Sequence, residues 1–241
     1  MTNVTYATNC WEKDWYYILN DSRLKKIIDN NSYDFDYRLL IINNVKEDTV
    51  KPLLKAIDNA IKIGAFTDFY FVNDHYEEAL DAISLKRSDI DIGYNYSISE
   101  WVAIHLCKTK YITYYMGDSI VDSNHDWITP SIKLLEDNEN IKVANPLWSY
   151  RHNEAMAESV YELKDFYIGH GFSDQCFLVR KEDFYADIYK EYHPDQIRYP
   201  VHAGDCFERR VYSWMRNKQV LRATYKHCSY IHKNWDSNIR I

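Results

Sequence analysis

Residues 111–122, YITYYMGDSIVD, decide the predicted fold. Tyr111–Tyr115 is a dense run of aromatic and β-branched residues, which is typical of a strand buried on both faces. The run breaks at Gly117, and the next residue is the acidic Asp118. Open α/β sheets bind ligands beyond the carboxyl ends of their strands. A buried strand that ends in a carboxylate therefore favours a functional site here, although an ordinary Gly-Asp-Ser turn also fits the pattern.

The order of elements around this strand predicts an α/β fold. Short apolar runs predict strands, and stretches with a 3.6-residue apolar period predict helices between them. The alternation predicts a mainly parallel central sheet flanked by helices in a single compact domain. The predicted strands are residues 4–8, 38–42, 69–72, 111–115, 141–144 and 175–179, with an extended tail at 223–235, and the main predicted helices are residues 11–28, 48–63, 97–107 and 205–217.

Composition narrows the classes of function. The net charge is −7 and there is no block of Lys or Arg, so we expect no nucleic-acid partner. The chain has 22 Tyr and 7 Trp, and aromatic side chains at this density often line clefts that stack sugar or base rings. Five scattered cysteines without a CxxC predict free thiols in a reducing compartment. With no predicted signal peptide or transmembrane segment, we expect a cytoplasmic protein, and docking to the inner face of a membrane stays open.

No GxGxxG or GxxxxGK[ST] pattern occurs, so the common nucleotide-binding loops are not predicted. Five stretches in order nevertheless carry a resemblance. They are VTYATN (4–9), RLLIINN (38–44), YITYYMGDSIVD with NHDWITPSIKLLE (111–122 and 124–136), GFSDQCFLVRKEDF (171–184) and AGDCFERRVYSWMRNKQVLRATYKHCSYIH (203–232). As an ordered set, they resemble a GT-A nucleotide-sugar glycosyltransferase of the inverting family 2 type.

The resemblance implies a GT-A fold in which residues 1–122 bind the nucleotide sugar and residues 123–241 bind the acceptor. It also implies transfer of a sugar from a nucleoside-diphosphate sugar to a hydroxyl of a glycan or lipid-linked glycan. Asp118 matches the last residue of the family's DxD element and His232 its closing histidine, so these two side chains would hold Mn²⁺ or Mg²⁺ on the diphosphate. The first Asp of that element is replaced by Met116.

Further site residues follow from the same resemblance. Asp205 stands where the family has its Glu-Asp pair, which makes it the expected general base. Asp205 and Glu208 also have the spacing of a capping box, so Asp205 could simply begin a helix. Thr8, Asn43 and Asp74 come at predicted strand ends, where they could bind base or ribose or merely form turns.

Trp148, Tyr150 and residues 170–174 fall where an acceptor sugar is expected, and loop packing would explain them equally well. Two other functions stay open. One is a nucleotide- or carbohydrate-binding module of the same fold without catalysis, which the absent first Asp favours. The other is a sugar-phosphate nucleotidyltransferase, which should have a glycine-rich loop after its first strand, whereas this chain has TNCWEKDW (8–15) there.

Overall fold

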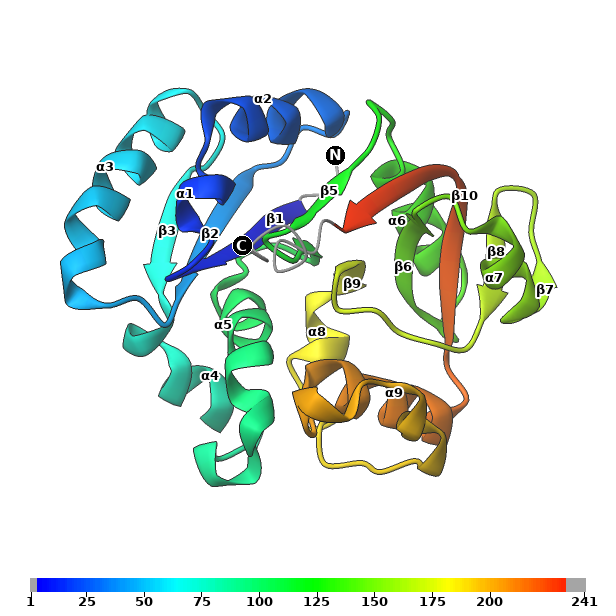
Figure 1. The fold of residues 1–241 in the computed structure, drawn as a ribbon. Coiled ribbons are helices and arrows are strands. Elements are labelled where there is room, and N and C mark those ends of the chain that lie inside the picture. The colour runs from blue at the N-terminus through cyan, green and yellow to red at the C-terminus, as the bar shows by residue number, and fades with distance from the viewer. Residues whose placement is uncertain (1–3, 233–241) are drawn as a thin grey trace.

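The computed structural model describes residues 4–232, so residues 233–235 of the predicted extended tail lie outside the described residues. Its strands form one ten-stranded sheet in the order β3-β2-β1-β4-β9-β6-β10-β8-β7, with β5 paired to β10 (Figure 1). The strands are β1 (Val4–Trp11), β2 (Tyr37–Asn43), β3 (Asp68–Phe71), β4 (Tyr111–Tyr115), β5 (Ser119–Val121), β6 (Ile141–Trp148), β7 (Ser159–Glu162), β8 (Phe166–Gly169), β9 (Cys176–Arg180) and β10 (Leu221–His232).

The direction of the strands changes across the sheet. β3, β2, β1 and β4 pair in parallel, as the alternation of strands and helices predicts. β9 then runs antiparallel to both β4 and β6, while β10 is parallel to β6 and antiparallel to β8. The predicted α/β fold class is confirmed, with a central sheet that is parallel in its first half and mixed overall.

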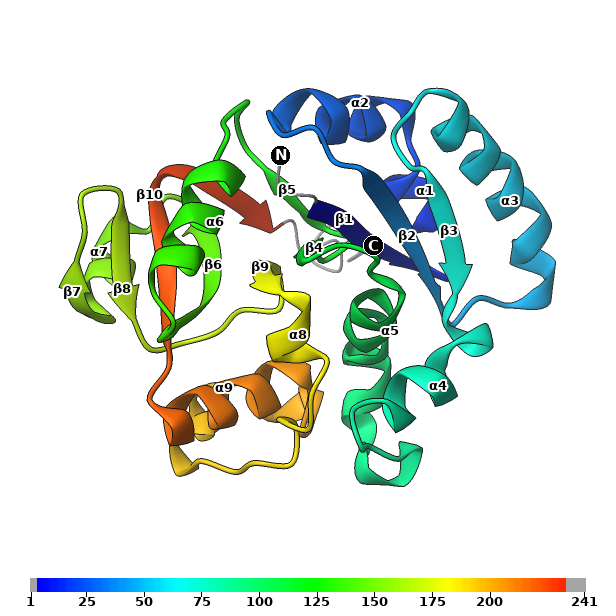
Figure 2. The same ribbon diagram turned by 180° about the vertical axis from the view of Figure 1, so that it is seen from behind.

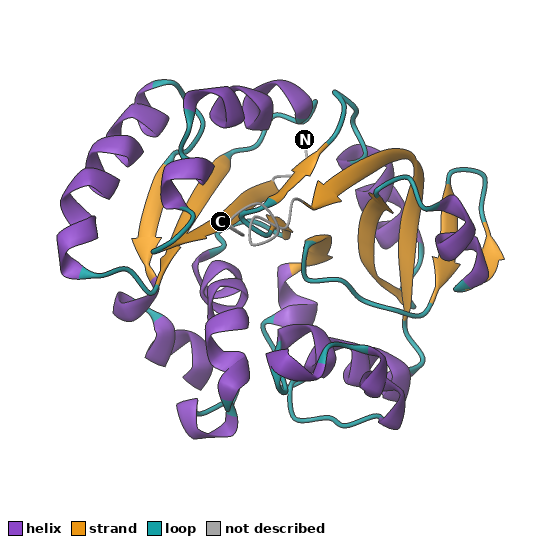
Figure 3. Cartoon of the chain, viewed as in Figure 1, coloured by secondary structure: helices purple, strands orange, loops and turns teal. Residues whose placement is uncertain are grey.

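Helices cover both faces of the sheet (Figures 1 and 3). Side chains alternate between the faces of a strand, and in β2 they separate into two cores. Leu40 and Ile42 pack in the core that includes α2 and α3, and Leu39 and Ile41 pack in the core that includes α5 and α9. The helices are α1 (Trp15–Ile18), α2 (Asp21–Asn30), α3 (Glu47–Lys62), α4 (Tyr76–Asp81), α5 (Ile98–Leu106), α6 (Ile128–Asp137), α7 (His152–Ala157), α8 (Lys181–Phe184) and α9 (Phe207–Lys218).

Two local predictions are wrong. The helix predicted over residues 11–28 is two helices, because the Asn20 side chain accepts a hydrogen bond from the Ser22 N–H at 3.0 Å and begins α2. The predicted capping box of Asp205 and Glu208 does not form, since α9 starts at Phe207 without a capping side chain from its own sequence. The Phe207 N–H instead donates to the hydroxyl of Ser97, at 2.7 Å. A residue from a distant element therefore satisfies this helix end, and the Asp205 carboxylate is not used there.

Strand β10 links distant parts of the sheet. Its first residues pair with β8 and β6, and its register shifts between Tyr225 and Ser229. The strand then bends, and Tyr230–His232 pair antiparallel with β5 near the middle of the molecule (Figures 1 and 2). None of the helices within residues 4–232 is long and apolar enough to cross a lipid bilayer.

Candidate functional site

The turn that follows β4 is held by side chains from two other elements. The Gly117 N–H donates to Oδ1 of Asn9, at 2.7 Å. The buried guanidinium of Arg23 in α2 donates to the carbonyl oxygens of both Gly117 and Ser119. Asp118 lies between these two carbonyls, so its backbone is fixed on both sides. A ligand residue that is supported in this way is preorganised for binding.

Strand pairing brings Asp118 and His232 together. Ser119 in β5 pairs with His232 in β10, which places Nε2 of His232 2.8 Å from Oδ2 of Asp118. The two side chains are only 17% and 20% exposed. Burial disfavours the charged imidazole, but the hydrogen bond and charge of Asp118, with the charge of Asp174, raise the pKa of His232 above its ordinary value. The two residues predicted to share a metal are therefore in direct contact.

The donor set at this contact fits a divalent cation. Oδ1 of Asp118 is buried and has no hydrogen-bond partner among residues 4–232, which leaves it able to bind a ligand. The two facing atoms are 2.8 Å apart, which is a hydrogen-bond distance, so a cation bound by both would displace the proton that His232 shares with Asp118. Within residues 4–232, no three His, Cys, Asp or Glu side chains converge to hold a metal. A cation between Asp118 and His232 would therefore need further ligands from substrate or water.

More carboxylates surround this pair. Burial raises the pKa of Asp174 to about 6, with the charge of His232 lowering it and that of Asp118 raising it. Burial, and then the charge of Asp174, raise the pKa values of Glu100 and Glu208 well above their usual range. Because each of these groups feels the charge of Asp174, they lie in one acidic region that runs from Asp118 to the start of α9.

The two acids at the start of α9 differ in their surroundings. The Asp205 side chain is 53% exposed, and its Oδ2 forms an ion pair with Nη2 of Arg210, at 2.9 Å. Glu208 is half-buried in the first turn of the helix and lines a cavity of about 360 Å³. The role predicted for Asp205 stays a prediction, and Glu208 is a second carboxylate close to it.

Of the three residues predicted to contact base or ribose, Thr8 and Asn43 lie on the neighbouring parallel strands β1 and β2, and Asp74 lies in a short 3₁₀ helix after β3. Thr8 is buried inside β1, because that strand extends to Trp11 instead of ending at Thr8. Asn43 ends β2, and its side-chain amide donates to the Asn95 carbonyl, at 3.0 Å. Asp74 is exposed just after β3. Only Asn43 and Asp74 are thus at strand ends, and their binding roles stay predictions.

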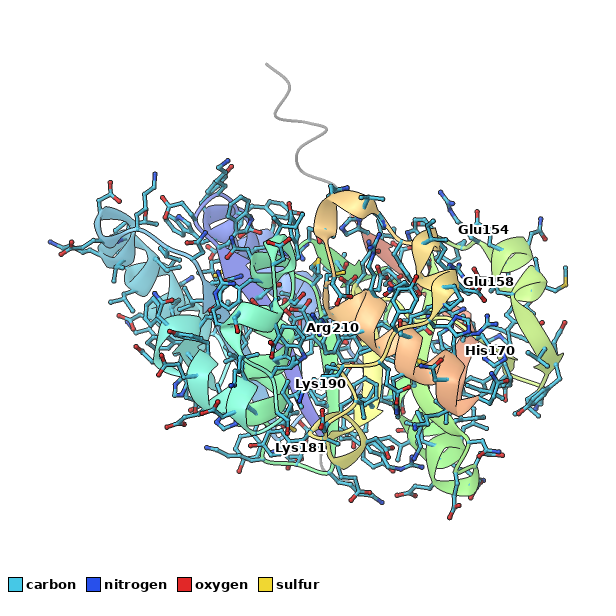
Figure 4. All side chains as sticks on the ribbon, turned by 90° about the horizontal axis from the view of Figure 1, so that it is seen from below. Glu154, Glu158, His170, Lys181, Lys190 and Arg210 are labelled. Atoms are coloured by element: carbon cyan, nitrogen blue, oxygen red, sulfur yellow. The ribbon has the colours of Figure 1, made fainter. Side chains whose placement is uncertain are left out.

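The cavity of about 360 Å³ coincides in part with the residues predicted for the acceptor. Trp148, Phe172 and Ser173 line it. Tyr150 is exposed on the surface, where its hydroxyl donates to Asp122. Figure 4 shows Glu158, another lining residue, on the same flank of the molecule as His170 in that view.

Sequence reasoning missed the residues that support the site. Asn9 directly follows Thr8, and its position next to a predicted strand end was the available signal. Arg23 gave no local signal, because the carbonyls it binds are 94 and 96 residues away. Glu208 was recognised only as part of a helix-capping pattern.

No family model matches the sequence, and no curated protein matches it. The fold is similar to that of GalNAc-T7 in a crystal structure with UDP, GalNAc and Mn²⁺, with a TM-score of 0.58 and 12% identity. That match covers 96% of this chain and 44% of GalNAc-T7, so the chain spans less than half of that protein. A mycobacterial protein of known structure matches at a TM-score of 0.49 and 12% identity, over 97% of this chain and 68% of its own, which is too weak to bear on the fold. The chain therefore has an α/β fold that matches the GT-A glycosyltransferase structure.

Proposed function

We propose that this chain is a glycosyltransferase that moves a sugar from a nucleoside-diphosphate sugar to a hydroxyl of a glycan acceptor, with inversion. The observation that carries the proposal is the contact between Asp118 and His232. It places a carboxylate that follows the central strand β4 beside a histidine from the distant strand β10, in a fold that matches GT-A enzymes. The leaving diphosphate gains negative charge during transfer, and it needs fixed positive charge nearby. Mn²⁺ or Mg²⁺ held by Asp118 and His232 would supply that charge.

The nucleoside would lie over the ends of β1–β3, beside Asn43 and Asp74. Thr8 is buried inside β1 beneath this position and would support it from below. The acceptor would occupy the cavity beside α9. Its hydroxyl needs a base within hydrogen-bond reach, and an effective base has a pKa near the working pH. Glu208 is the stronger candidate, because it lines the cavity and burial raises its pKa. Asp205, the base predicted from the sequence, is the alternative.

Nucleotide binding tests the donor site. Thermal unfolding of the wild type with UDP, GDP or dTDP, each with and without Mn²⁺, should show a metal-dependent rise in Tm for at least one nucleotide. Asp118→Asn and His232→Gln should each abolish the metal-dependent part. His227→Gln is the matched control, because His227 lies on β10 too but is half exposed and bonds to Asp165. If no nucleotide shifts the Tm of the wild type, the proposal fails.

Transfer tests the base. With the nucleotide that binds, release of nucleoside diphosphate from its sugar esters should require acceptor and should be stopped by EDTA. Glu208→Gln should lower kcat by about 10²–10⁴-fold, and Asp205→Asn should leave it within a factor of a few. The opposite order would assign the base to Asp205. Nucleotide binding without any transfer would favour the non-catalytic module, for which Met116 in place of an acid is the supporting observation.

A further inference from the structure

The cavity beside α9 is lined by ion pairs between arginine and glutamate side chains. Glu158 accepts from Arg198 and, at 3.0 Å, from Arg222. The charge of these two guanidinium groups outweighs the effect of burial and lowers the pKa of Glu158, so it stays ionised. Nearer the surface, Arg151 pairs with Glu154 at 2.8 Å.

The lining also contains Glu208, whose pKa burial raises well above its usual range. A carboxylate ligand would meet the ionised Glu158, and an ammonium ligand would meet Arg198 and Arg222. Either charge would therefore face a like charge as well as a partner. The arrangement suits an uncharged ligand that carries both donors and acceptors.

Two lining residues have buried polar atoms that find no hydrogen-bond partner in the part of the chain that the structure describes. Asn145 is 5% exposed, and its Oδ1 accepts no hydrogen bond, although its amide donates to the Pro146 carbonyl at 2.6 Å. Nε of Arg222 is a donor that is likewise buried and unpaired. A buried acceptor and a buried donor that both lack partners are costly unless a ligand satisfies them. Hydroxyl groups can serve both, because each is a donor and an acceptor.

Aromatic rings complete the lining. Tyr199 and Phe172 hold each other through hydrogen bonds from the Tyr199 hydroxyl to the Phe172 carbonyl and from the Phe172 N–H to that hydroxyl. Trp148 is 41% exposed at the cavity, with the Arg151 guanidinium 4.1 Å from its ring centroid. Flat apolar rings beside hydrogen-bonding groups suit a sugar ring, because its faces are apolar and its edge carries hydroxyl groups.

From these observations we infer that the cavity binds an uncharged pyranose of the acceptor, held by hydrogen bonds to Glu158, Arg222 and Asn145 and by contact with Trp148. That this sugar is the acceptor rests on the proposed function. The carbohydrate specificity itself follows from the cavity.

The test uses saturation-transfer NMR on the full chain without nucleotide or metal, so that it is independent of the donor site. The probes are methyl glucoside, methyl galactoside and N-acetylglucosamine, with glucuronate and glucosamine as charged counterparts. We expect at least one uncharged sugar to bind, and to bind at least fivefold more tightly than both charged sugars. Trp148→Ala should weaken that binding at least tenfold. Tyr192→Ala is the control, because Tyr192 is 69% exposed and does not line the cavity.

The inference is overturned if no uncharged sugar binds, if glucuronate or glucosamine binds more tightly, or if Tyr192→Ala weakens binding as much as Trp148→Ala does. Glu158→Gln gives a second check on a folded variant, verified by its circular dichroism. It should reduce the discrimination against glucuronate, because it removes a negative charge that the carboxylate ligand would face. Nucleotide binding with no sugar binding would refute this inference alone, whereas sugar binding with no nucleotide binding would refute only the proposed function.

Discussion

Replacing Gly117 by alanine should damage the turn that carries Asp118. A Cβ built on Gly117 would come well inside 3.0 Å of the Asn9 carbonyl oxygen and to 3.3 Å from Oδ1 of the same residue. Asn9 cannot easily move, since it is inside β1 and in register with Ile41 of β2. The backbone of Gly117 is not in the left-handed region, so the expected damage is purely steric.

The size of the effect follows from two contributions. Forcing an extra methyl group into a packed site costs about 1–3 kcal/mol. If the turn shifts to make room, it also loses the 2.7 Å bond from the Gly117 N–H to Asn9, which contributes about 0.5–1.5 kcal/mol. Their sum, a loss of about 1.5–4.5 kcal/mol in the free energy of unfolding, corresponds to a fall of about 3–18 °C in Tm for a chain of this size.

The assay is thermal unfolding of purified protein at pH 7.5, without nucleotide, followed by circular dichroism. Ser119→Ala is the matched control two positions away, because the buried Ser119 hydroxyl has no partner within residues 4–232 and its loss should be neutral or slightly stabilising. A Tm for Gly117→Ala within 1 °C of wild type would refute the close approach to Asn9. In the nucleotide assay, Gly117→Ala should also reduce the Mn²⁺-dependent rise in Tm, since the turn positions Asp118.

Three other predictions concern stability and pH. Tyr115→Phe should lower Tm by about 2–12 °C, because the buried Trp127 indole N–H loses its 3.0 Å partner at a cost of about 1–3 kcal/mol. Tyr111→Phe, on the same strand, should lower Tm less, and equal losses would contradict the explanation. Burial raises the pKa of Asp174 from 3.8 to about 6, so its ionisation destabilises the folded state by an amount that is absent at low pH, grows between the two pKa values and is constant above about 6. Asp174→Asn should therefore raise Tm more at pH 8 than at pH 5, and the reverse order would refute the direction of the shift. The pKa of His232 is raised in the folded state, so its protonation stabilises the protein below the unfolded pKa of about 6.5, and this stability is lost as the pH rises through the folded pKa. In metal-free protein, His232→Gln should therefore lower Tm more at pH 5.5 than at pH 9. Equal decreases would count against the ion pair.

Sequence patterns predicted strands β1–β4, β6, β9 and β10 from their own runs of apolar residues, but they missed the short strands β5, β7 and β8. Tyr111–Tyr115 is a strand with the predicted bounds, and β2 and β9 fall within one residue of their predicted ends. The helix predicted over 11–28 failed because a single polar residue, Asn20, begins a new helix inside a continuous apolar pattern. The predicted pattern could not distinguish one helix from two that share a face.

The site was harder to predict, because its geometry depends on pairings between distant elements. Asp118 was found from its own strand, but its contact with His232 requires the pairing of β5 with β10 and was reached only through a family resemblance. Ser97 illustrates the same difficulty. It begins the helix predicted over residues 97–107, yet its hydroxyl donates to the Gly93 carbonyl and accepts from the N–H of Phe207 at the start of α9. Local sequence patterns do not reveal which distant residue a side chain will hydrogen-bond.

The path of β10 has a consequence for how the protein is made. Among residues 4–232, every other strand precedes β10, yet β10 lies between β6 and β8 and then reaches β5. During synthesis the parallel strands β1–β4 can pair early, whereas β6 and β8 each keep one edge unpaired until the ribosome has released β10. The wait ends only when these long-range pairs close, and such pairs form slowly. A nascent chain is therefore most prone to aggregate in this interval, and it cannot bring a histidine to Asp118 until the interval is over.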